Sequence, residues 1–293
     1  LYFDTYKSCK ANCRFHITDD LNLGYDIVDE WAMQEPEKKA LVWCNDAGEE
    51  KVFTFTDISR LSNQTANYFQ SLGIKKGTVV MLILRRRWEY WICAVALHKI
   101  GAILIPGSLQ LAKKDLIYRG NSAQIHTMVC LDDKYVLEQV NEAQPSVPSI
   151  QHKIVVGGSH EGWRNFHEEV EKFPTEFARP TGEAGTKAHD LMLVYFTSGT
   201  TGEPKMVEHD YTHPLGHIVT AKYWQQVQEN KLHMSVSDSG WAKFGWGKIY
   251  GQWICGAVIF AYDMDKFVPT HLLQKMQDYK LTTFCAPPTM YRF

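Results

Sequence analysis

The segment YFTSGTTGEPK, residues 195–205, combines the residue types that bind polyphosphate. Gly199 and Gly202 can adopt positive φ and let a ligand approach the backbone closely. Successive N–H groups in such a turn form a concave anion site. Further donors are hydroxyl groups and one ammonium group, those of Ser198, Thr200, Thr201 and Lys205. The segment therefore predicts a binding site for phosphate groups.

The segment follows the apolar run LMLVYFT, residues 191–197, which is typical of a strand. Thr197 ends this run at the carboxyl end, where open α/β sheets bind their ligands. The spacing differs from a P-loop, because two residues separate the glycines and Met206 stands where Ser or Thr is required. A flexible Ser/Thr/Gly connector is the alternative. The order strand, TSGTTG, PK is more specific than composition alone and favours a phosphate site.

A second segment with possible chemistry is WAKFGWGKIYGQW, residues 241–253. On a helix, Lys243 and Trp246 would face the same way. A lysine beside aromatic rings can hold a carboxylate or form a cation–π contact. The alternative is that Phe244 and Trp246 belong to the helix core and that Lys243 is solvated.

The segment at 195–205 resembles the phosphate-binding signature of the adenylate-forming superfamily, which includes acyl-CoA synthetases, luciferases and peptide-synthetase adenylation domains. SDSGW, residues 237–241, resembles the next motif of that superfamily. The segments WEYWICAVALHKIGAILIPGSLQLAKKDLIYR, PKMVEHD and CAPPTMYR resemble the medium-chain acyl-CoA synthetase branch. The similarity runs from about Gly24 to the last residue.

The resemblance implies an α/β fold with two mostly parallel sheets covered by helices, as in the large N-terminal domain of these enzymes. It implies that a small or medium-chain carboxylic acid reacts with ATP to give acyl-AMP and pyrophosphate, and that the acyl group passes to coenzyme A. Mg²⁺ is expected beside the phosphates. The implied phosphate-binding residues are Thr197, Ser198, Gly199, Thr200, Thr201, Gly202 and Lys205, of which Lys205 and Thr200 would be catalytic. The implied substrate-binding residues are Trp241, Lys243, Phe244 and Trp246.

This chemistry needs no general base in the protein, because a carboxylic acid with a pKa near ~4 is already ionised at neutral pH. It needs positioning and neutralisation of charge on the departing pyrophosphate. The superfamily's later motifs would lie beyond residue 293, so we expect a fragment that is inactive alone. Two alternatives stay open: an amino-acid or aryl-acid adenylation module, in which Asp238 could hold an ammonium group, or a non-catalytic nucleotide-binding fragment.

Composition and net charge limit the kinds of partner and the compartment that the protein is expected to have. The net charge of −2 over 293 residues disfavours nucleic acid as a partner. No apolar run approaches the length of a membrane span. Homo-oligomerisation is left open. The seven scattered cysteines indicate reduced thiols and suggest a cytoplasmic protein.

Three other clusters of polar residues are not expected to bind a metal ion or a ligand. Cys9, Cys13 and His16 offer only three possible zinc ligands, and no metal site is expected. Pro214 is expected to interrupt any helix around it, which predicts that the neighbouring histidines lie in a loop or on the surface, with a metal site as the minor alternative. These histidines are His209, His213 and His217. The run from Arg85 to Arg87 could meet coenzyme A phosphates, although a solvated face is the default interpretation.

Strand-like and helix-like segments alternate along the chain, which is typical of mostly parallel sheets. Expected strands include 79–84, 102–106, 126–131, 153–156, 191–197, 233–236, 257–262 and 282–286. Expected helices include 88–99, 113–119, 163–172, 211–228, 246–255 and 269–279, together with one that Thr56 would cap and Gly73 would end. A loose stretch at 173–190 predicts two α/β subdomains, 1–175 and 176–293.

Overall fold

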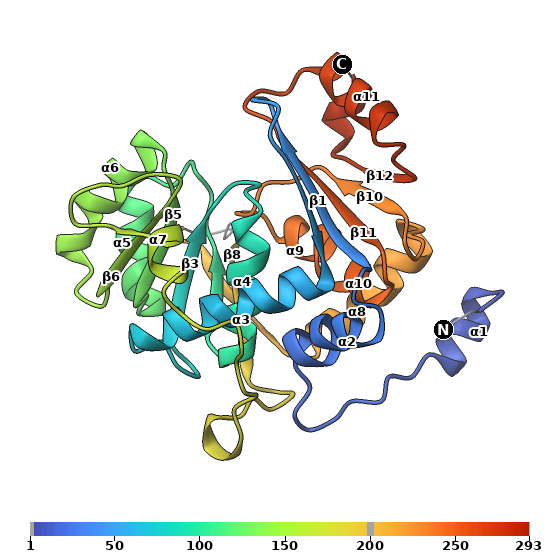
Figure 1. Ribbon diagram of the computed structural model, residues 1–293, viewed down its shortest axis with the longest axis horizontal. Coiled ribbons are helices and arrows are strands. Elements are labelled where there is room, and N and C mark those ends of the chain that lie inside the picture. Colours follow the sequence, from blue (N-terminus) through green and yellow to red (C-terminus); the bar gives the residue numbers. More distant parts are fainter. Residues whose placement is uncertain (1–2, 198–201, 293) are drawn as a thin grey trace.

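A computed structural model describes residues 3–197 and 202–292 of the chain. Two mostly parallel sheets lie side by side with helices packed around them, which confirms the expected fold class (Figure 1). In the described residues, the strand order is β7-β6-β5-β3-β4-β8-β9 in the larger sheet and β12-β10-β11-β1-β2 in the smaller one.

The strands of the larger sheet are β3 (Val79–Ile83), β4 (Ile103–Pro106), β5 (Thr127–Leu131), β6 (His152–Val156), β7 (Arg164–Asn165), β8 (Leu191–Thr197) and β9 (Lys205–Asp210). Those of the smaller sheet are β1 (Lys39–Asn45), β2 (Glu50–Thr54), β10 (Leu232–Ser235), β11 (Val258–Asp263) and β12 (Thr283–Cys285). Two edge strands, β2 and β9, run antiparallel to their neighbours.

The helices are α1 (Tyr6–Asn12), α2 (Glu30–Gln34), α3 (Phe55–Ser71), α4 (Glu89–Ile100), α5 (Lys113–Ala123), α6 (Lys134–Ala143), α7 (Phe166–Val170), α8 (His213–Val219), α9 (Ala242–Lys248), α10 (Tyr250–Ile254) and α11 (Pro269–Asp278). Two π-helical segments are Gly24–Asp29 and Thr220–Trp224, and short 3₁₀ turns are Gln144–Ser146, Gly182–Ala184 and Pro288–Arg292.

Each sheet contains strands from both sides of the expected boundary at residues 175 and 176. In the smaller sheet, Leu41 of β1 pairs with Ile259 of β11. In the larger sheet, Leu104 of β4 pairs with Leu193 of β8. The two sheets are therefore not built from two consecutive halves of the chain.

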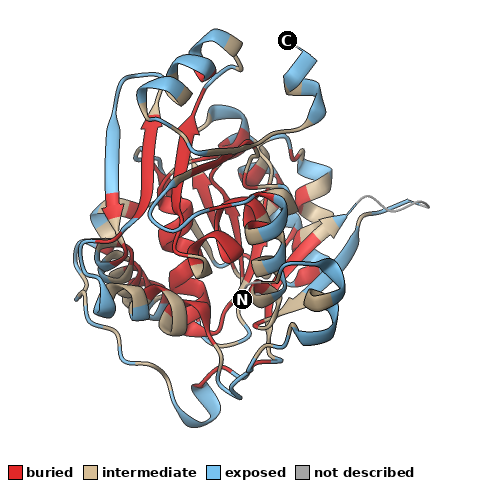
Figure 2. Cartoon of the chain, turned by 90° about the vertical axis from the view of Figure 1, so that its right-hand side faces the viewer, coloured by how far each residue is buried: buried red, intermediate tan, exposed pale blue. Residues whose placement is uncertain are grey.

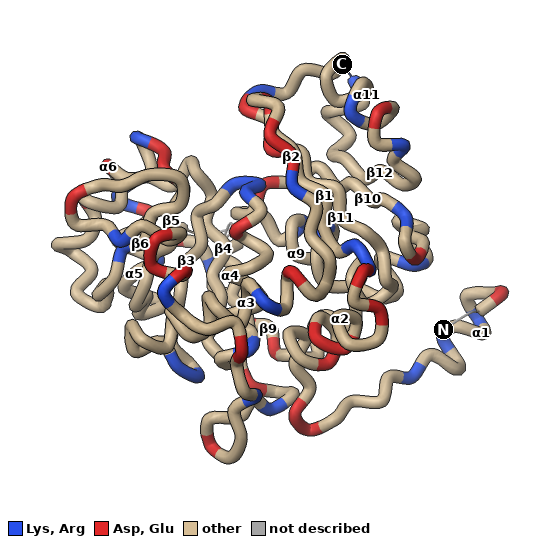
Figure 3. The backbone as a smooth tube through the Cα atoms, viewed as in Figure 1, with Lys and Arg blue, Asp and Glu red and all other residues tan. Residues whose placement is uncertain are grey.

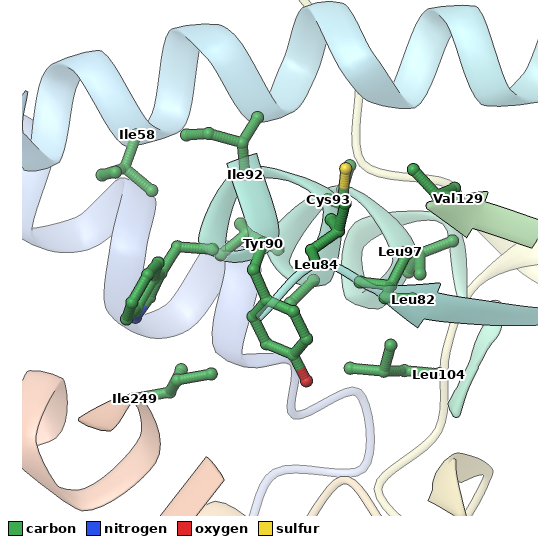
Figure 4. Close-up of a cluster of buried hydrophobic side chains, with 14 of the residues drawn as sticks. Ile58, Leu82, Leu84, Tyr90, Ile92, Cys93, Leu97, Leu104, Val129 and Ile249 are labelled. Carbon is green, nitrogen blue, oxygen red and sulfur yellow. The ribbon is translucent and has the colours of Figure 1, made fainter. Parts of the chain in front are cut away.

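The helix α4 forms the centre of the core. All of its residues are buried: most are apolar, and the charged side chains of Glu89 and Lys99 form ion pairs with Arg87 and Asp29. Figure 4 shows its side chains, including Tyr90 and Ile92, between α3 and residues of both halves of the chain, such as Leu104 and Ile249. Gly101, with a φ of +85°, ends α4 in the left-handed conformation that glycine adopts readily.

The capping residue of α3 differs from the expected one. The hydroxyl of Thr54 accepts a hydrogen bond from the backbone N–H of Asp57, and the Asp57 carboxylate accepts one from the backbone N–H of Thr54. This capping box starts α3 at Phe55, so Thr56 lies inside the helix instead of capping it.

Buried residues gather in the strands at the centre of the molecule, and exposed residues lie on the surrounding helices and loops (Figure 2). Lysine and arginine are interspersed with aspartate and glutamate along the backbone (Figure 3). Within residues 3–197 and 202–292, no helix is long and apolar enough to cross a membrane.

Candidate active site

The proposed phosphate loop connects β8 and β9, which form a hairpin at the edge of the larger sheet. Thr197 and Lys205 lie directly opposite each other at its base, and both are exposed. Gly202 has a φ of +116°, a conformation that favours glycine. The other expected phosphate ligands lie outside the described residues: Ser198, Gly199, Thr200 and Thr201.

The helix α5 holds the hairpin at this end. The Tyr118 hydroxyl donates a hydrogen bond to the carbonyl oxygen of Pro204, at 2.9 Å. The Arg119 guanidinium lies 4.9 Å from the ring centroid of Phe196, within cation–π range. Both flanks of the loop are therefore fixed by contacts from a neighbouring helix.

The segment from Ser237 to Trp241 lies at the carboxyl ends of the strands of the larger sheet, as does the start of the loop. The strand β4 is the neighbour of β8, and Ser108 follows β4 directly. A Cβ added to Gly240 would lie 2.5 Å from the backbone of Ser108, so the two segments touch. The backbone N–H of Ser239 donates to the carbonyl of Arg85, which follows β3. Carboxyl ends of adjacent parallel strands thus bring the two sequence motifs to one edge.

A cavity of about 390 Å³ opens beside this segment. Its lining consists of Arg86, Val236, Ser237, Asp238, Trp241, Lys243 and Pro287. Trp241 is 64% exposed and stands at the N-cap of α9, so its ring borders the cavity without belonging to the core. Two of the expected substrate-binding residues, Trp241 and Lys243, therefore share one cavity.

The other two expected substrate-binding residues lie elsewhere. Phe244 is fully buried in the core, with its ring 4.6 Å from Tyr90 and 4.9 Å from Trp91 between centroids, and it does not line this cavity, so its contact with the substrate stays a prediction. Trp246 packs against Trp224 with a centroid separation of 5.5 Å. Sequence reasoning missed Trp224, because it is separated from α9 in sequence and is 62% exposed at the end of a π-helical turn.

The arginine run is not a solvated face, and that interpretation is wrong for Arg85 and Arg86. Arg86 is 8% exposed, pairs with the Asp238 carboxylate and donates to the carbonyl of Met264. Arg85 lies 2.7 Å from the carboxylate of Asp263. Burial raises the pKa of Asp263, and Arg85 and Arg86 oppose that effect. These pairs join the end of β3 to the smaller sheet. One indication of this role was available in the sequence: the arginine run directly follows the carboxyl end of a predicted strand.

The three histidines were expected in a loop or on the surface because Pro214 would interrupt a helix. Pro214 instead lies in the first turn of α8, so His213 and His217 belong to this helix. His213 and His217 face each other with 3.2 Å between their Nε2 atoms, and the tilted ring of His209 lies 4.1 Å from that of His213 between centroids. Burial lowers the pKa of His213 to about 3 and that of His217 to about 4, and repulsion among the rings adds to the effect. Across the described residues, no group of three or more His, Cys, Asp or Glu side chains is placed to hold a metal ion.

The sequence profile of the AMP-binding enzymes matches residues 28–293. The chain belongs to this family.

Among similar proteins, the mitochondrial acyl-coenzyme A synthetase ACSM3 of Pongo abelii is 33% identical over 298 aligned positions, which cover 99% of this chain and 50% of that protein. The mitochondrial acyl-coenzyme A synthetase ACSM4 of Mus musculus is 31% identical, with 96% and 49% covered. The chain therefore spans about half the length of the curated relatives it matches.

Solved structures share the fold. The acyl-CoA synthetase of Brucella canis superposes with a TM-score of 0.86 at 20% identity, covering 99% of this chain and 53% of that one. The anthranilate CoA ligase AuaEII, solved with anthranoyl-AMP, gives a TM-score of 0.79 at 21% identity and covers 92% and 49%.

The expectation of a cytoplasmic protein is contradicted, because the similar synthetases are named as mitochondrial. The cysteine argument excludes only an oxidising compartment. It does not separate the cytosol from another reducing compartment.

Proposed function

We propose that the full-length protein containing this chain is an AMP-forming acyl-CoA synthetase that activates a small or medium-chain carboxylic acid. The observation that carries the proposal is the packing of the segment from Ser237 to Trp241, which lines the cavity, against Ser108 after β4, the neighbour of the strand β8 that leads into the phosphate loop, in a chain of the AMP-binding family. The activity is proposed for a longer protein, because the chain spans about half the length of its relatives.

In this proposal the loop between β8 and β9 binds the β- and γ-phosphates of ATP. Hydroxyl groups and the Lys205 ammonium are the donors that suit phosphate oxygens. Lys205 and Thr200 would reduce the charge that builds up on departing pyrophosphate. When bound, Mg²⁺ would supply further neutralising charge to the phosphates.

The cavity is proposed to hold the carboxylate end of the acid. Trp241 would separate it from the phosphate site, and Lys243 would lie beside the carboxylate. Trp246 and its partner Trp224 extend the aromatic surface from α9 to the preceding π-helical turn. The full-length protein would then transfer the acyl group from acyl-AMP to the thiol of coenzyme A: the thioester bond forms, the acyl–phosphate bond breaks and AMP leaves.

An adenylation module for amino acids fits less well. Such a module needs a free carboxylate for the substrate ammonium group, and Asp238 was the candidate. Its carboxylate is engaged by the Arg86 guanidinium. Pyrophosphate exchange stimulated by amino acids in preference to aliphatic acids would favour this alternative.

We also propose that the protein works in the mitochondrion, in line with the names of its relatives. Fractionation of cells, with antibodies raised against this chain, would test the location. Recovery in the cytosol alone would contradict it.

The central test is ATP–pyrophosphate exchange by the full-length protein across a panel of aliphatic acids. We expect exchange with some of them and a loss of about 100-fold in Lys205→Met, since one charged donor to the phosphates disappears. Lys134→Met is the matched control, because the Lys134 side chain is 90% exposed on α6. No exchange with any acid, in a folded full-length protein, would refute the proposal.

A further inference from the structure

A buried lysine lies behind the proposed acid cavity. Lys248, the last residue of α9, is fully buried. Its Nζ donates to the carbonyl oxygen of Ser237 at 3.3 Å and lies 4.9 Å from the Phe244 ring centroid. Within the described part of the chain it forms no ion pair. An ammonium group held in the interior by one carbonyl and one ring is costly for stability, which indicates a role beyond packing.

The carbonyl that Lys248 holds belongs to the segment that borders the cavity. Ser237 lines the cavity itself, and Trp241 lies four residues further along the same segment. On its other side, the segment is fixed by the contact of Gly240 with Ser108. Lys248 therefore supports the inner side of the segment whose outer side faces the substrate.

We propose that Lys248 is a positioning residue for the acid: its ammonium group holds the Ser237 carbonyl, fixes the segment from Ser237 to Trp241, and adds a positive charge behind the carboxylate site. The proposal rests on the proposed acyl-CoA synthetase function. Lys248 does not line the cavity, so it acts through Ser237 and by its electric field.

Charged groups from several elements surround Lys248. Asp238 and Asp263 favour its charged form, and Arg86 and Lys243 disfavour it. The charge of Lys248 also helps burial to lower the pKa of His233 in β10. Burial is the largest effect and lowers the pKa of Lys248 to about 7. Below that pH the ammonium form supports the segment, and above it the neutral amine donates a weaker hydrogen bond and carries no charge.

The measurement is KM for the acid and KM for ATP in the full-length protein between pH 6 and pH 8.5. For the wild type we expect the acid KM to rise about tenfold with pH, the size of one charge-assisted hydrogen bond, while the ATP KM changes little. In Lys248→Met the acid KM should already be high at pH 6 and stay flat. Lys231→Met, an exposed lysine beside β10, is the control and should follow the wild type.

Two further readouts separate positioning from a structural role. Replacing Lys248 with methionine removes the cost of a buried unpaired charge together with the donor to the Ser237 carbonyl, so the thermal midpoint should change little, whereas loss of a structural lysine would lower it clearly. Magnetic resonance of this chain with ¹³C-labelled lysine should show one signal that titrates near neutral pH and is missing in Lys248→Met.

Parallel acid-KM profiles in wild type and Lys248→Met would overturn the proposal and leave the synthetase function standing. Absence of pyrophosphate exchange in the wild type would instead overturn the function, and the positioning role with it.

Discussion

Gly240 packs closely against the backbone of Ser108, and this contact can be tested by adding one methyl group. We expect Gly240→Ala to lower the free energy of unfolding by about 1–3 kcal/mol, because the new Cβ would lie 2.5 Å from the Ser108 backbone. Chemical denaturation of this chain measures the effect. Gly216→Ala on α8 is the control, since a Cβ there meets no atom within 4 Å. Equal stability of the two variants would contradict the packing argument.

At the scale of single residues, the phosphate loop and the role of Trp241 could be proposed from the sequence because their chemistry is local; both roles stay predictions, and the structure places Trp241 at the cavity. The loop's glycines, hydroxyls and lysine lie within one segment. The role of Arg86 could not be predicted in the same way, because its partner Asp238 comes from a strand end far along the chain. Lys248 was equally hidden, since only packing shows that a lysine in a mixed segment is fully buried.

Among the elements, α5 determines how firmly the phosphate loop is held. Tyr118→Phe removes the hydrogen bond to the Pro204 carbonyl and leaves the ring in place. We expect ATP binding by the full-length protein to weaken about threefold to tenfold, since one neutral hydrogen bond contributes about 1 kcal/mol. Isothermal titration measures the change. Tyr135→Phe on α6, where the tyrosine is 46% exposed, should bind ATP like the wild type.

The helix α8 makes stability depend on pH. The pKa values of His213 and His217 lie near 3 and 4, below the value near ~6.5 of an unfolded histidine. The unfolded chain therefore binds more protons, so stability is complete above about pH 6.5 and falls as the pH drops towards 4.

We expect His213→Gln to reduce this decline between pH 7 and pH 5, where carboxylates contribute least. Urea midpoints across that range measure it. His16→Gln, at an exposed position near the N-terminus, should keep the wild-type slope. A variant slope equal to that of the wild type would show that the histidines do not cause the decline.

At this scale the apolar runs predicted the buried strands well, because a strand covered on both faces is apolar throughout. The edge strand β9 was missed, since its residues from Lys205 to Glu208 are exposed and lack that pattern. The strand β1 was also missed. The start of α8 was misjudged because proline is unfavourable inside a helix but suits its first turn.

For the whole molecule, Arg86 links the two sheets. We expect Arg86→Met to destabilise this chain by about 3 kcal/mol, because Asp238 loses its partner and the carbonyl of Met264 its donor. Urea unfolding measures the loss. Arg60→Met on the exposed side of α3 should stay within about 0.5 kcal/mol of the wild type. A loss no greater than that of the control would rule out the link.

The fold class could be predicted from the alternation of elements, but the grouping of strands into sheets could not. Loose composition at 173–190 suggested a boundary between two halves. Pairing of β1 with β11 and of β4 with β8 depends on contacts between distant segments, which no local pattern encodes.

The pairing of β1 with β11 also bears on how the protein is made. Leu41 leaves the ribosome long before its partner Ile259, by about 10 to 40 seconds at ordinary rates of translation. During that time β1 lacks its neighbour β11 and can pair only with β2 in the sheet, so the edge of β1 that will face β11 stays unpaired. The smaller sheet is completed late, so we expect chaperones to contact the emerging protein mainly at this strand.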